Sequence, residues 1–375
     1  MSKDAGRLSG NAGEFSEIYV AARLLVDGQV PVIDRSGNRS GASIPIHGIR
    51  RTERDNKSVY VQRGEDDYLC IVNEARMPAR NYGALKELTT RLLAEIQSGK
   101  SDLSRKASAL TFYCPSADAL VGELSFSGLK AKSGEKADLE LRITDLFSVN
   151  GFRDAGFTIK SMLGSAPSLT NAGATIFRYK VTCENLSELD QLVISDMSGK
   201  PLIRKLMNLP GFRFDFLGVE SEAYAENLRM IDTLFAPMLA AALFHSYQVV
   251  GGRFSSVFGD DRYMVKLSEV CGAGDNLPFF IHKFKDFLKQ SALGMQPKKR
   301  WEGSNEVSGG ALIVQPDGQV VCLCTDKDSD FRDYLFENCR FETPSSGDGV
   351  NKLCAVRKDA SGDYIIRLSL QIRFR

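Results

Sequence analysis

Apolar residues in the first hundred positions recur with two different periods. Over residues 14–26 they stand three and four apart, as on one face of an amphipathic helix, at Phe15, Ile18, Tyr19, Ala22 and Leu25. Short strand-like runs follow at 58–62 and 68–72, and helical spacing returns over 82–96. The opening of the chain is therefore predicted to mix helices with strands.

The strand pattern is strongest over residues 110–183, where we expect the central sheet. Five runs carry the pattern: ALTFYC, GELSFSG, ADLELRI, GFTIKSML and ATIFRYKVTC. Residues 187–293 have mainly helical spacing, and strands return after residue 309, in ALIVQPDGQVVCLC and DYIIRLSLQIRFR. Strands flanked by helices without regular β-α-β alternation predict an α+β (mixed α/β) fold, with a central mixed sheet flanked by helices.

Composition adds little to this division. A chain of 375 residues with 43% hydrophobic positions can bury a large core, as one domain or two. The charges nearly cancel, at +1 overall, so the basic excess of many simple DNA-coating proteins is missing. DNA binding is still compatible with this balance, because an enzyme can carry basic residues on one face and acidic residues elsewhere.

The eight cysteines are scattered and, with only His47, His245 and His282 beside them, show no zinc-binding spacing. We interpret them as reduced cysteines packed in the core. The first residues contain no apolar segment of the kind found in signal peptides, and the longest apolar stretch, 234–244, is too short to span a membrane. A cytoplasmic protein is the expectation.

Candidate chemistry lies on two neighbouring strands of the expected sheet. Asp138 enters the strand DLELRI, and Lys160 lies on the next strand, GFTIKS. Because side chains alternate along a strand, Thr158 and Lys160 share a face and can meet Asp138. A carboxylate that binds a metal and a lysine that orients water are what phosphodiester hydrolysis requires. The spacing alone is weak, however, since most lysines on strands are solvent-facing.

A single aspartate supplies few ligands for Mg²⁺, which is usually held by one or two carboxylates together with the substrate phosphate, so we expect a second acid. Residues 160–180 offer no second acid. Glu14 and Glu17, three apart on the first helix, are the best source of one. The alternative is that both simply complement the helix dipole at the start of that helix.

Four separated stretches, in the same order along nearly the whole chain, resemble the HpaII-type restriction endonucleases. They are GNAGEFSEIYVAARLLVDGQV; KADLELRI with GFTIKSMLGSAPSLTNAG; ALGMQPKKRWEGSNEVSGGALIVQPDGQV; and FENCRFETPSS with YIIRLSLQIRF. The family resembles the PD-(D/E)xK nuclease class, in which an Asp on one strand and an acid-x-Lys on the next form the metal site. This resemblance implies a Mg²⁺-dependent type II enzyme that cuts both strands of DNA.

Carried over to this chain, the resemblance makes Asp138 a metal ligand and Lys160 the catalytic lysine. The acid position of the second strand is occupied by Thr158, which raises the importance of Glu14 or Glu17 as metal ligands. The implied target is CCGG, within a restriction-modification system whose cytosine methyltransferase protects the same site.

A restriction-endonuclease-like core with helical and C-terminal β additions is the implied architecture. The four regions would be 1–109, contributing to the nuclease core; 110–185, the catalytic sheet; 186–295, mainly helical; and 296–375, β-rich and suited to DNA recognition.

Several polar residues are candidates for DNA contacts. The stretch 164–168 could begin a short helix that points N–H groups and hydroxyls at a phosphate, and basic residues follow the last long helix. The candidates are Ser165, Ser168, Asn171, Lys298, Lys299 and Arg300. Base edges could be read from the C-terminal strands by Arg340, Arg357, Arg367 or Arg373. Each has an ordinary alternative as a turn residue, a helix-end charge or a solvated strand residue.

Cutting both strands of a symmetric site suggests a two-fold dimer on DNA, with a monomer that nicks each strand in turn as the alternative. Two other functions stay open: a modification- or structure-dependent nuclease, and a DNA-binding protein with a decayed nuclease site. A metal-free phosphodiesterase based on histidine is disfavoured, because the three histidines have no spacing suited to catalysis.

Overall fold

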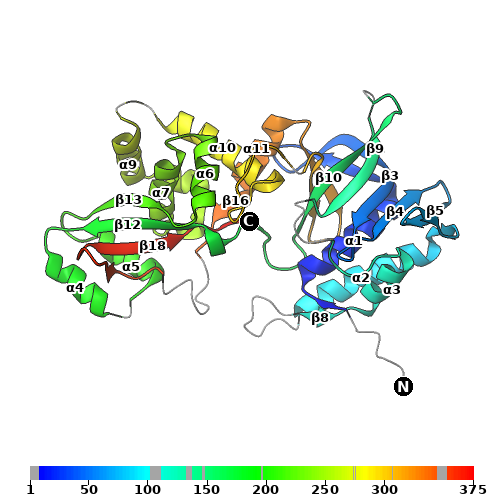
Figure 1. Ribbon diagram of the computed structural model, residues 1–375, viewed down its shortest axis with the longest axis horizontal. Coiled ribbons are helices and arrows are strands. Elements are labelled where there is room, and N and C mark those ends of the chain that lie inside the picture. Colours follow the sequence, from blue (N-terminus) through cyan, green and yellow to red (C-terminus); the bar gives the residue numbers. More distant parts are fainter. Residues whose placement is uncertain are drawn as a thin grey trace, which may run out of the picture. The chain divides into compact units, whose positions relative to one another are not determined.

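The computed structural model describes residues 8–101, 111–131, 137–145, 148–195, 197–272, 274, 276–305, 307–343 and 353–375. The chain forms two compact units, each built from two segments (Figure 1). The first unit comprises Met1–Pro167 and Asn305–Tyr334, and the second comprises Ser168–Ser304 and Leu335–Arg375.

The first unit is built on a ten-stranded sheet. Its strands are β2 (Gln29–Ile33), β3 (Arg39–Thr52), β4 (Ser58–Arg63), β5 (Asp67–Val72), β6 (Ala75–Arg76), β7 (Arg80–Asn81), β9 (Leu139–Thr144), β10 (Phe152–Ser161), β14 (Gly310–Val314) and β15 (Val320–Cys324). They run in the order β2-β15-β14-β10-β9-β3-β4-β5-β6, with β7 on β5, and β2 also pairs with β3. β10 is antiparallel to β9 and parallel to β14, so the expected mixed sheet is confirmed.

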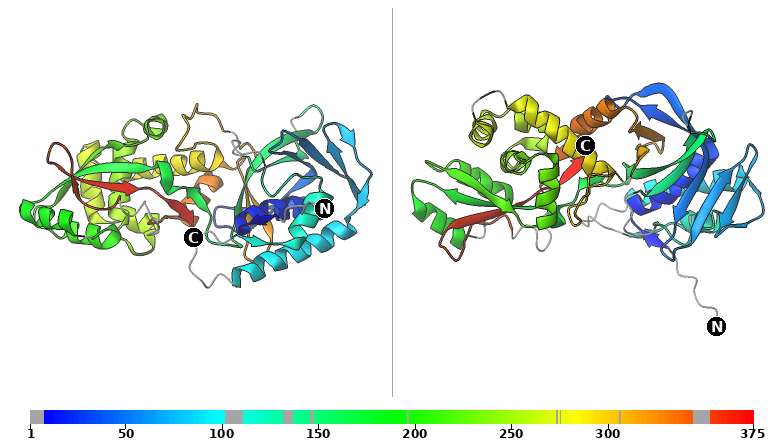
Figure 2. Two further views of the ribbon diagram at one scale, coloured as in Figure 1. Left: turned by 60° about the horizontal axis from the view of Figure 1, so that its bottom comes forward. Right: turned by 45° about the horizontal axis from the view of Figure 1, so that its top comes forward.

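Helix α1 (Ala12–Asp27) forms the centre of the first unit's core. It contacts β3 and β10 on one side and α2 (Tyr82–Ser101) on the other, as Figure 2 shows. Asn11 caps its start, and Gly28, whose left-handed φ of 69° suits glycine, ends it. The helix expected over residues 14–26 is therefore confirmed, with slightly wider bounds.

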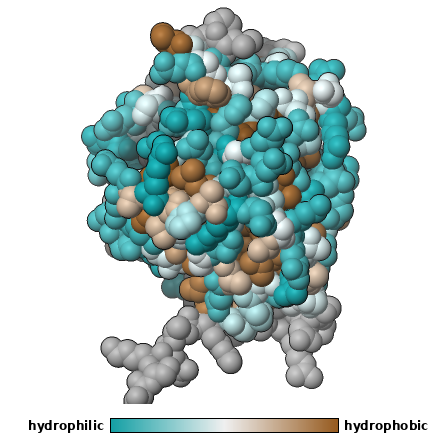
Figure 3. Space-filling model, turned by 90° about the vertical axis from the view of Figure 1, so that its right-hand side faces the viewer, coloured by the Kyte–Doolittle hydropathy of each residue, from teal (hydrophilic) through white to brown (hydrophobic). Residues whose placement is uncertain are grey.

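Smaller elements complete the first unit. They are α3 (Pro115–Glu123), which packs on α2, and the ribbon of β1 (Ser9–Gly10) and β8 (Phe112–Tyr113). The chain passes from the first unit to the second within helix α11 (Asp328–Asn338), between Tyr334 and Leu335. The side of this unit seen in Figure 3 is mostly hydrophilic, with apolar residues in small groups, as is usual for a surface in water.

The second unit contains two smaller sheets. The four-stranded sheet has the order β13-β12-β18-β17, from β13 (Arg213–Val219), β12 (Ile176–Thr182), β18 (Tyr364–Ser369) and β17 (Arg357–Lys358). The three-stranded sheet has the order β11-β19-β16, from β11 (Ser168–Thr170), β19 (Ile372–Phe374) and β16 (Cys339–Phe341).

Helices make up most of the rest of this unit: α4 (Leu186–Ile194), α5 (Gly199–Met207), α6 (Glu222–Ile231), α7 (Phe235–Ser246), α8 (Phe254–Phe258), α9 (Asp261–Cys271) and α10 (Leu277–Leu293), with short 3₁₀ turns at Ala172–Ala174 and Val250–Gly252. Within the described chain, no single helix has the length and apolar character to cross a membrane. Only α6 and α7 taken together, across a bend of 105°, would meet that measure.

Three sequence-based expectations were wrong. The run GELSFSG forms the end of α3 and a turn, because Pro115 starts a helix that continues to Glu123. The run ATIFRYKVTC does form a strand, β12, but in the second unit, so residues 110–183 do not make one sheet. The segment 164–168 starts no helix; it bends and then enters β11. All eight cysteines are free, as expected.

Candidate active site

Asp138 is held where β9 meets β10, near the centre of the large sheet. Its backbone N–H donates to the carbonyl of Phe157 (2.9 Å), which continues the β9–β10 ladder by one residue. Its carboxylate oxygen Oδ2 accepts two hydrogen bonds, from the Thr158 hydroxyl (3.0 Å) and from the Ile159 N–H (2.6 Å). The carboxylate is thus fixed against β10, as the pairing of these strands had predicted.

Thr158 and Lys160 follow the alternation of β10. Thr158 is buried between β9 and β14, where its Cα lies opposite Ala311, and Lys160, opposite Ile313, is half-buried. Two residues along a strand are about 7 Å apart and point to the same face. Since Thr158 bonds to Asp138, Lys160 projects from the same face one step farther along the strand.

Glu17 brings a second carboxylate to Asp138 from α1. The pKa of Glu17 is raised to about 8, chiefly by burial and then by the charge of Asp138, although Arg51, Lys130 and a hydrogen bond with the Ala131 backbone act in the opposite direction. Asp138 therefore lies close enough for its charge to disfavour the ionisation of Glu17. A divalent cation between them would remove that repulsion.

Glu14 is engaged at the start of α1. Its backbone N–H donates to the Asn11 side chain (3.1 Å), and its carboxylate accepts from the Asn11 N–H (2.9 Å), a reciprocal capping box. It also forms an ion pair with Lys130. Burial alone would raise the pKa of Glu14, but Lys130 and the Asn11 N–H outweigh it and the pKa is lowered. Of the two helix carboxylates, Glu17 is the one that senses Asp138.

Sequence reasoning missed a buried ion pair beside these acids. Arg51 and Glu53 are 3% and 1% exposed, and Arg51 Nε lies 3.2 Å from Glu53 Oε1. Arg51 donates to the carbonyl of Gly128 (3.0 Å), and its positive charge acts on both Glu17 and Asp138. The available signal was the strand alternation that places Arg51 on the same face as Ile49, but no strand was predicted over residues 39–52.

Lys130 and Arg54 also come to this region unpredicted. A hollow of about 360 Å³ opens beside Glu14, and its lining includes Ser9, Arg54, Ser127 and Lys130. Both cations lower the pKa of Glu14, and Lys130 does the same for Glu17. Positive side chains therefore lie near both Glu14 and Glu17.

These residues fit a hard divalent cation. No group of three or more His, Cys, Asp and Glu side chains is placed to hold a metal ion within the described ranges. Two oxygen ligands of the protein suffice for an ion such as Mg²⁺, which keeps several waters and takes further ligands from a phosphate. The feature that favours a cation here is the carboxyl group of Glu17, which is buried within reach of the charge of Asp138.

The expected DNA contacts in residues 164–171 fall in a bend and a short strand. Ser165 is exposed in the bend, and Ser168 starts β11, where it pairs with Arg373 of β19. Asn171 is exposed and precedes a 3₁₀ turn that its side chain does not cap. The structure places Ser165 in the first unit and the other two in the second.

Lys298, Lys299 and Arg300 are exposed in a loop beyond the end of α10. Asn227, fully buried on α6, holds this loop: its side chain donates to the carbonyls of Gln296 (3.0 Å) and Lys299 (2.8 Å) and accepts from the Trp301 N–H (2.7 Å). Arg300 pairs with Glu226. Asn227 therefore holds the loop that carries these three basic side chains, which stay candidates for phosphate contacts.

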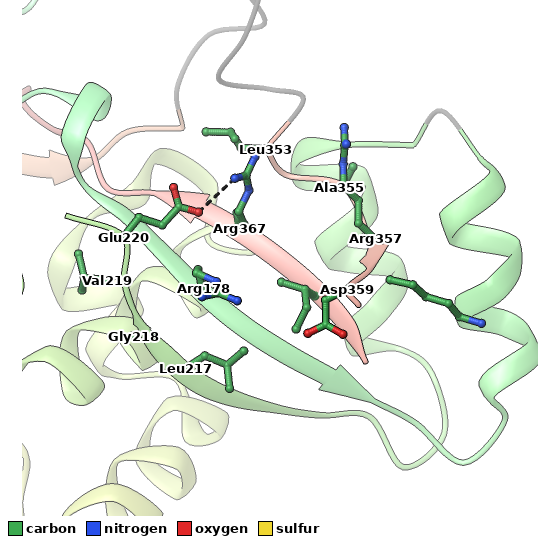
Figure 4. Close-up of a pocket in the computed structure, with 12 residues that line it drawn as sticks. Arg178, Leu217, Gly218, Val219, Glu220, Leu353, Ala355, Arg357, Asp359 and Arg367 are labelled. Carbon is green, nitrogen blue, oxygen red and sulfur yellow. Dashed lines mark hydrogen bonds and ion pairs between the residues drawn. The ribbon is translucent and has the colours of Figure 1, made fainter. Parts of the chain in front are cut away.

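The four arginines considered for base reading divide into two pairs. Arg340 and Arg373 lie opposite each other in the three-stranded sheet, where Arg340 also bonds to Glu342 (2.8 Å). Arg357 and Arg367 lie on β17 and β18 of the four-stranded sheet, beside a hollow (Figure 4).

Comparison with known proteins agrees with the sequence resemblance. The family model described as HpaII restriction endonuclease matches residues 11–374. The type II restriction enzyme HpaII of Haemophilus parainfluenzae is 31% identical over 375 residues, which covers 98% of each chain. No solved structure matches. Restriction endonucleases act on double-stranded DNA and generally use divalent metal ions. The chain belongs to the HpaII restriction endonuclease family and is a type II site-specific deoxyribonuclease.

Proposed function

We propose that this enzyme cuts both strands of duplex DNA at a short fixed sequence in a Mg²⁺-dependent reaction, with its active site at Asp138, Glu17, Thr158 and Lys160. The feature that supports this most directly is the approach of the Glu17 carboxyl group on α1 to Asp138 at the start of β9, where burial and the charge of Asp138 raise the pKa of Glu17 to about 8. Such a pair gains from a cation and has no evident structural purpose without one.

Asp138 and Glu17 would hold the Mg²⁺. When bound, the ion polarises the scissile phosphate and lowers the pKa of the attacking water. Thr158 and the Ile159 N–H keep the Asp138 carboxylate in one orientation through the hydrogen bonds at its Oδ2. The Thr158 hydroxyl thus stands where the nuclease class has an acid, and its function in this chain is to position Asp138.

Lys160 supplies the cation on the same face of β10. Its ammonium group can orient the attacking water and offset the negative charge that develops on the phosphate. The buried pair Arg51–Glu53 supports this site. The charge of Arg51 partly offsets the rise in the pKa of Glu17. Glu53 accepts a hydrogen bond from the Ser127 N–H (3.1 Å), which fixes the loop that leads to Lys130. Glu14 remains a weaker candidate ligand because it is engaged in the cap.

The target is proposed to be CCGG, because the relative that spans the whole chain is HpaII and the resemblance extends over all four stretches. A methyltransferase that modifies a cytosine of the same site would then protect host DNA. A two-fold dimer would place one active site on each strand.

The test is digestion of unmethylated and CCGG-methylated plasmid with Mg²⁺ or with EDTA, followed by sequencing of the ends. Lys160→Ala protein, purified in parallel, controls for contaminating nucleases. Mg²⁺-dependent ends at CCGG that methylation blocks would support both the reaction and the target. Discrete ends at another sequence would keep the reaction and reject CCGG, and DNA binding without any cleavage would point to a decayed site or a modified substrate.

A further inference from the structure

One face of the four-stranded sheet in the second unit gathers arginines from three neighbouring strands. Arg178 of β12 lies directly opposite Arg367 of β18, and Arg357 of β17 lies opposite Ile365, two residues from Arg367 on β18. Residues that alternate in this way share one face of a sheet. The three side chains are among those that line a hollow of about 610 Å³. Figure 4 shows them on this face of the sheet.

The opposite face of this sheet is closed by helices. Phe177 and Tyr179 of β12 are fully buried, and the Tyr179 hydroxyl donates to the carbonyl of Ala240 in α7 (2.9 Å). The arginine face therefore belongs to a sheet that is already anchored on its other side. Its side chains are available for a contact without loss of the unit's core.

The charges on this face are unbalanced. Four basic and two acidic side chains line the hollow, and both acids already have partners. Glu220 pairs with Arg367 (3.1 Å), and Asp359 accepts the backbone N–H groups of Ser361 and Asp363 in the β17–β18 turn. Within the described parts of the chain, no hydrogen bond or ion pair engages the exposed Arg178 guanidinium.

Like charges placed directly across two strands destabilise a sheet. Glu220 offsets the charge of Arg367 but not that of Arg178, so an anionic or acceptor-rich partner at Arg178 would stabilise this arrangement. Guanidinium groups present parallel N–H donors that fit two acceptors at once, either two oxygens of a phosphate or O6 and N7 of guanine.

We propose that this face, defined by Arg178, Arg357 and Arg367, is a duplex-DNA contact surface of the enzyme. The proposal rests on the proposed function, because DNA is the polyanion on which this enzyme acts. Arg178 is the most informative member, since its removal breaks no ion pair inside the protein.

The test measures binding of fluorescent duplexes, with and without the target site, to full-length protein in EDTA, where cleavage is blocked. Arg178→Ala is expected to weaken binding about tenfold, and Arg178→Glu further. Arg262→Ala is the control, because Arg262 is an exposed arginine on α9, which packs against α7 on the helical side of the sheet. This variant should bind as wild type, although it removes an ion pair with Asp260. Thermal unfolding would verify that each variant keeps its fold.

The two kinds of contact separate by their salt dependence. Weaker binding to both duplexes with a smaller salt slope identifies a phosphate contact, and a loss confined to the target duplex identifies a guanine contact. Both results support the surface. Wild-type affinity both in Arg178→Glu and in a variant with Arg178, Arg357 and Arg367 all changed to alanine would overturn this inference but leave the proposed function standing. A wild-type protein that binds no duplex would overturn the proposed function as well.

Discussion

The two units bury different kinds of side chain. Among the described residues, the fully buried charged groups, Arg51 and Glu53, lie in the first unit next to the proposed active site. The buried polar groups of the second unit, such as Asn227, are neutral. Its core is rich in aromatic residues, among them Phe214 and Phe244, whose stacked rings have centroids 4.1 Å apart. The first unit thus buries an ion pair, which costs desolvation free energy, beside its proposed active site. The second unit keeps its charged side chains out of its core.

The largest effect that this comparison predicts is on catalysis in the first unit. Lys160→Ala should lower the cleavage rate by about 10³-fold or more, because the charge that offsets the developing phosphate charge is lost. DNA binding and the free energy of unfolding should change little. Single-turnover cleavage, duplex binding and urea unfolding check the three expectations, and a variant that cuts at the wild-type rate would remove Lys160 from the site.

The second unit should respond to pH through its core. His245 is 3% exposed, and burial lowers its pKa from 6.5 to about 4. As the pH falls, His245 is protonated in the unfolded chain before it is protonated in the folded chain. The stability that neutral His245 contributes is therefore fully present above pH 6.5 and is lost progressively toward pH 4, a total loss of roughly 3 kcal/mol in the free energy of unfolding. His245→Phe, between Phe214 and Tyr263, should remove this loss, as urea unfolding at pH 7 and pH 4.5 would show. Parallel pH profiles for the two proteins would contradict it.

The third prediction separates two acids of one helix. Glu17→Gln should lower activity about 10²-fold and raise the Mg²⁺ concentration needed, because a charged ligand beside Asp138 is lost. Glu14→Gln is the matched control: glutamine keeps the capping box, so activity should stay near wild type. Mg²⁺ titrations of the cleavage rate distinguish the two, and the reverse order of effects would make Glu14 the ligand.

The smallest expected effect concerns the start of α1. Asn11→Ala removes the side-chain acceptor of the capping box and should lower the free energy of unfolding by about 1 kcal/mol. Because the helix remains packed over its whole length, cleavage should persist. Urea unfolding and a plasmid assay check this, and a loss of activity larger than the loss of stability would mean that the cap also positions Glu17.

Local patterns predicted the parts of the site that follow from spacing. The helical period located α1, and the alternation on β10 predicted that Thr158 meets Asp138 and that Lys160 shares its face of the strand. The sequence did not separate Glu14 from Glu17, because they differ in contacts with Asn11 and Lys130 that a helical period does not contain.

Long-range pairing was beyond those patterns. A strand's composition does not identify its neighbour, so β12 was assigned to the central sheet, although it pairs with β13 and β18 in the second unit. Strands β2 and β3 were not predicted. The buried charges of Arg51 and Glu53 also contradicted the usual preference of such residues for the surface.

The parallel pairing of β10 with β14 constrains how the enzyme matures during translation. Phe157 lies opposite Gly310, so the strand that carries Lys160 lacks this neighbour until more than 300 residues have been synthesised. A nascent chain on the ribosome can fold α1, β9 and β10 early, but its nuclease sheet stays incomplete while the second unit is made. With the active site on β10, as proposed, DNA-cutting activity is expected to appear only after β14 has been synthesised.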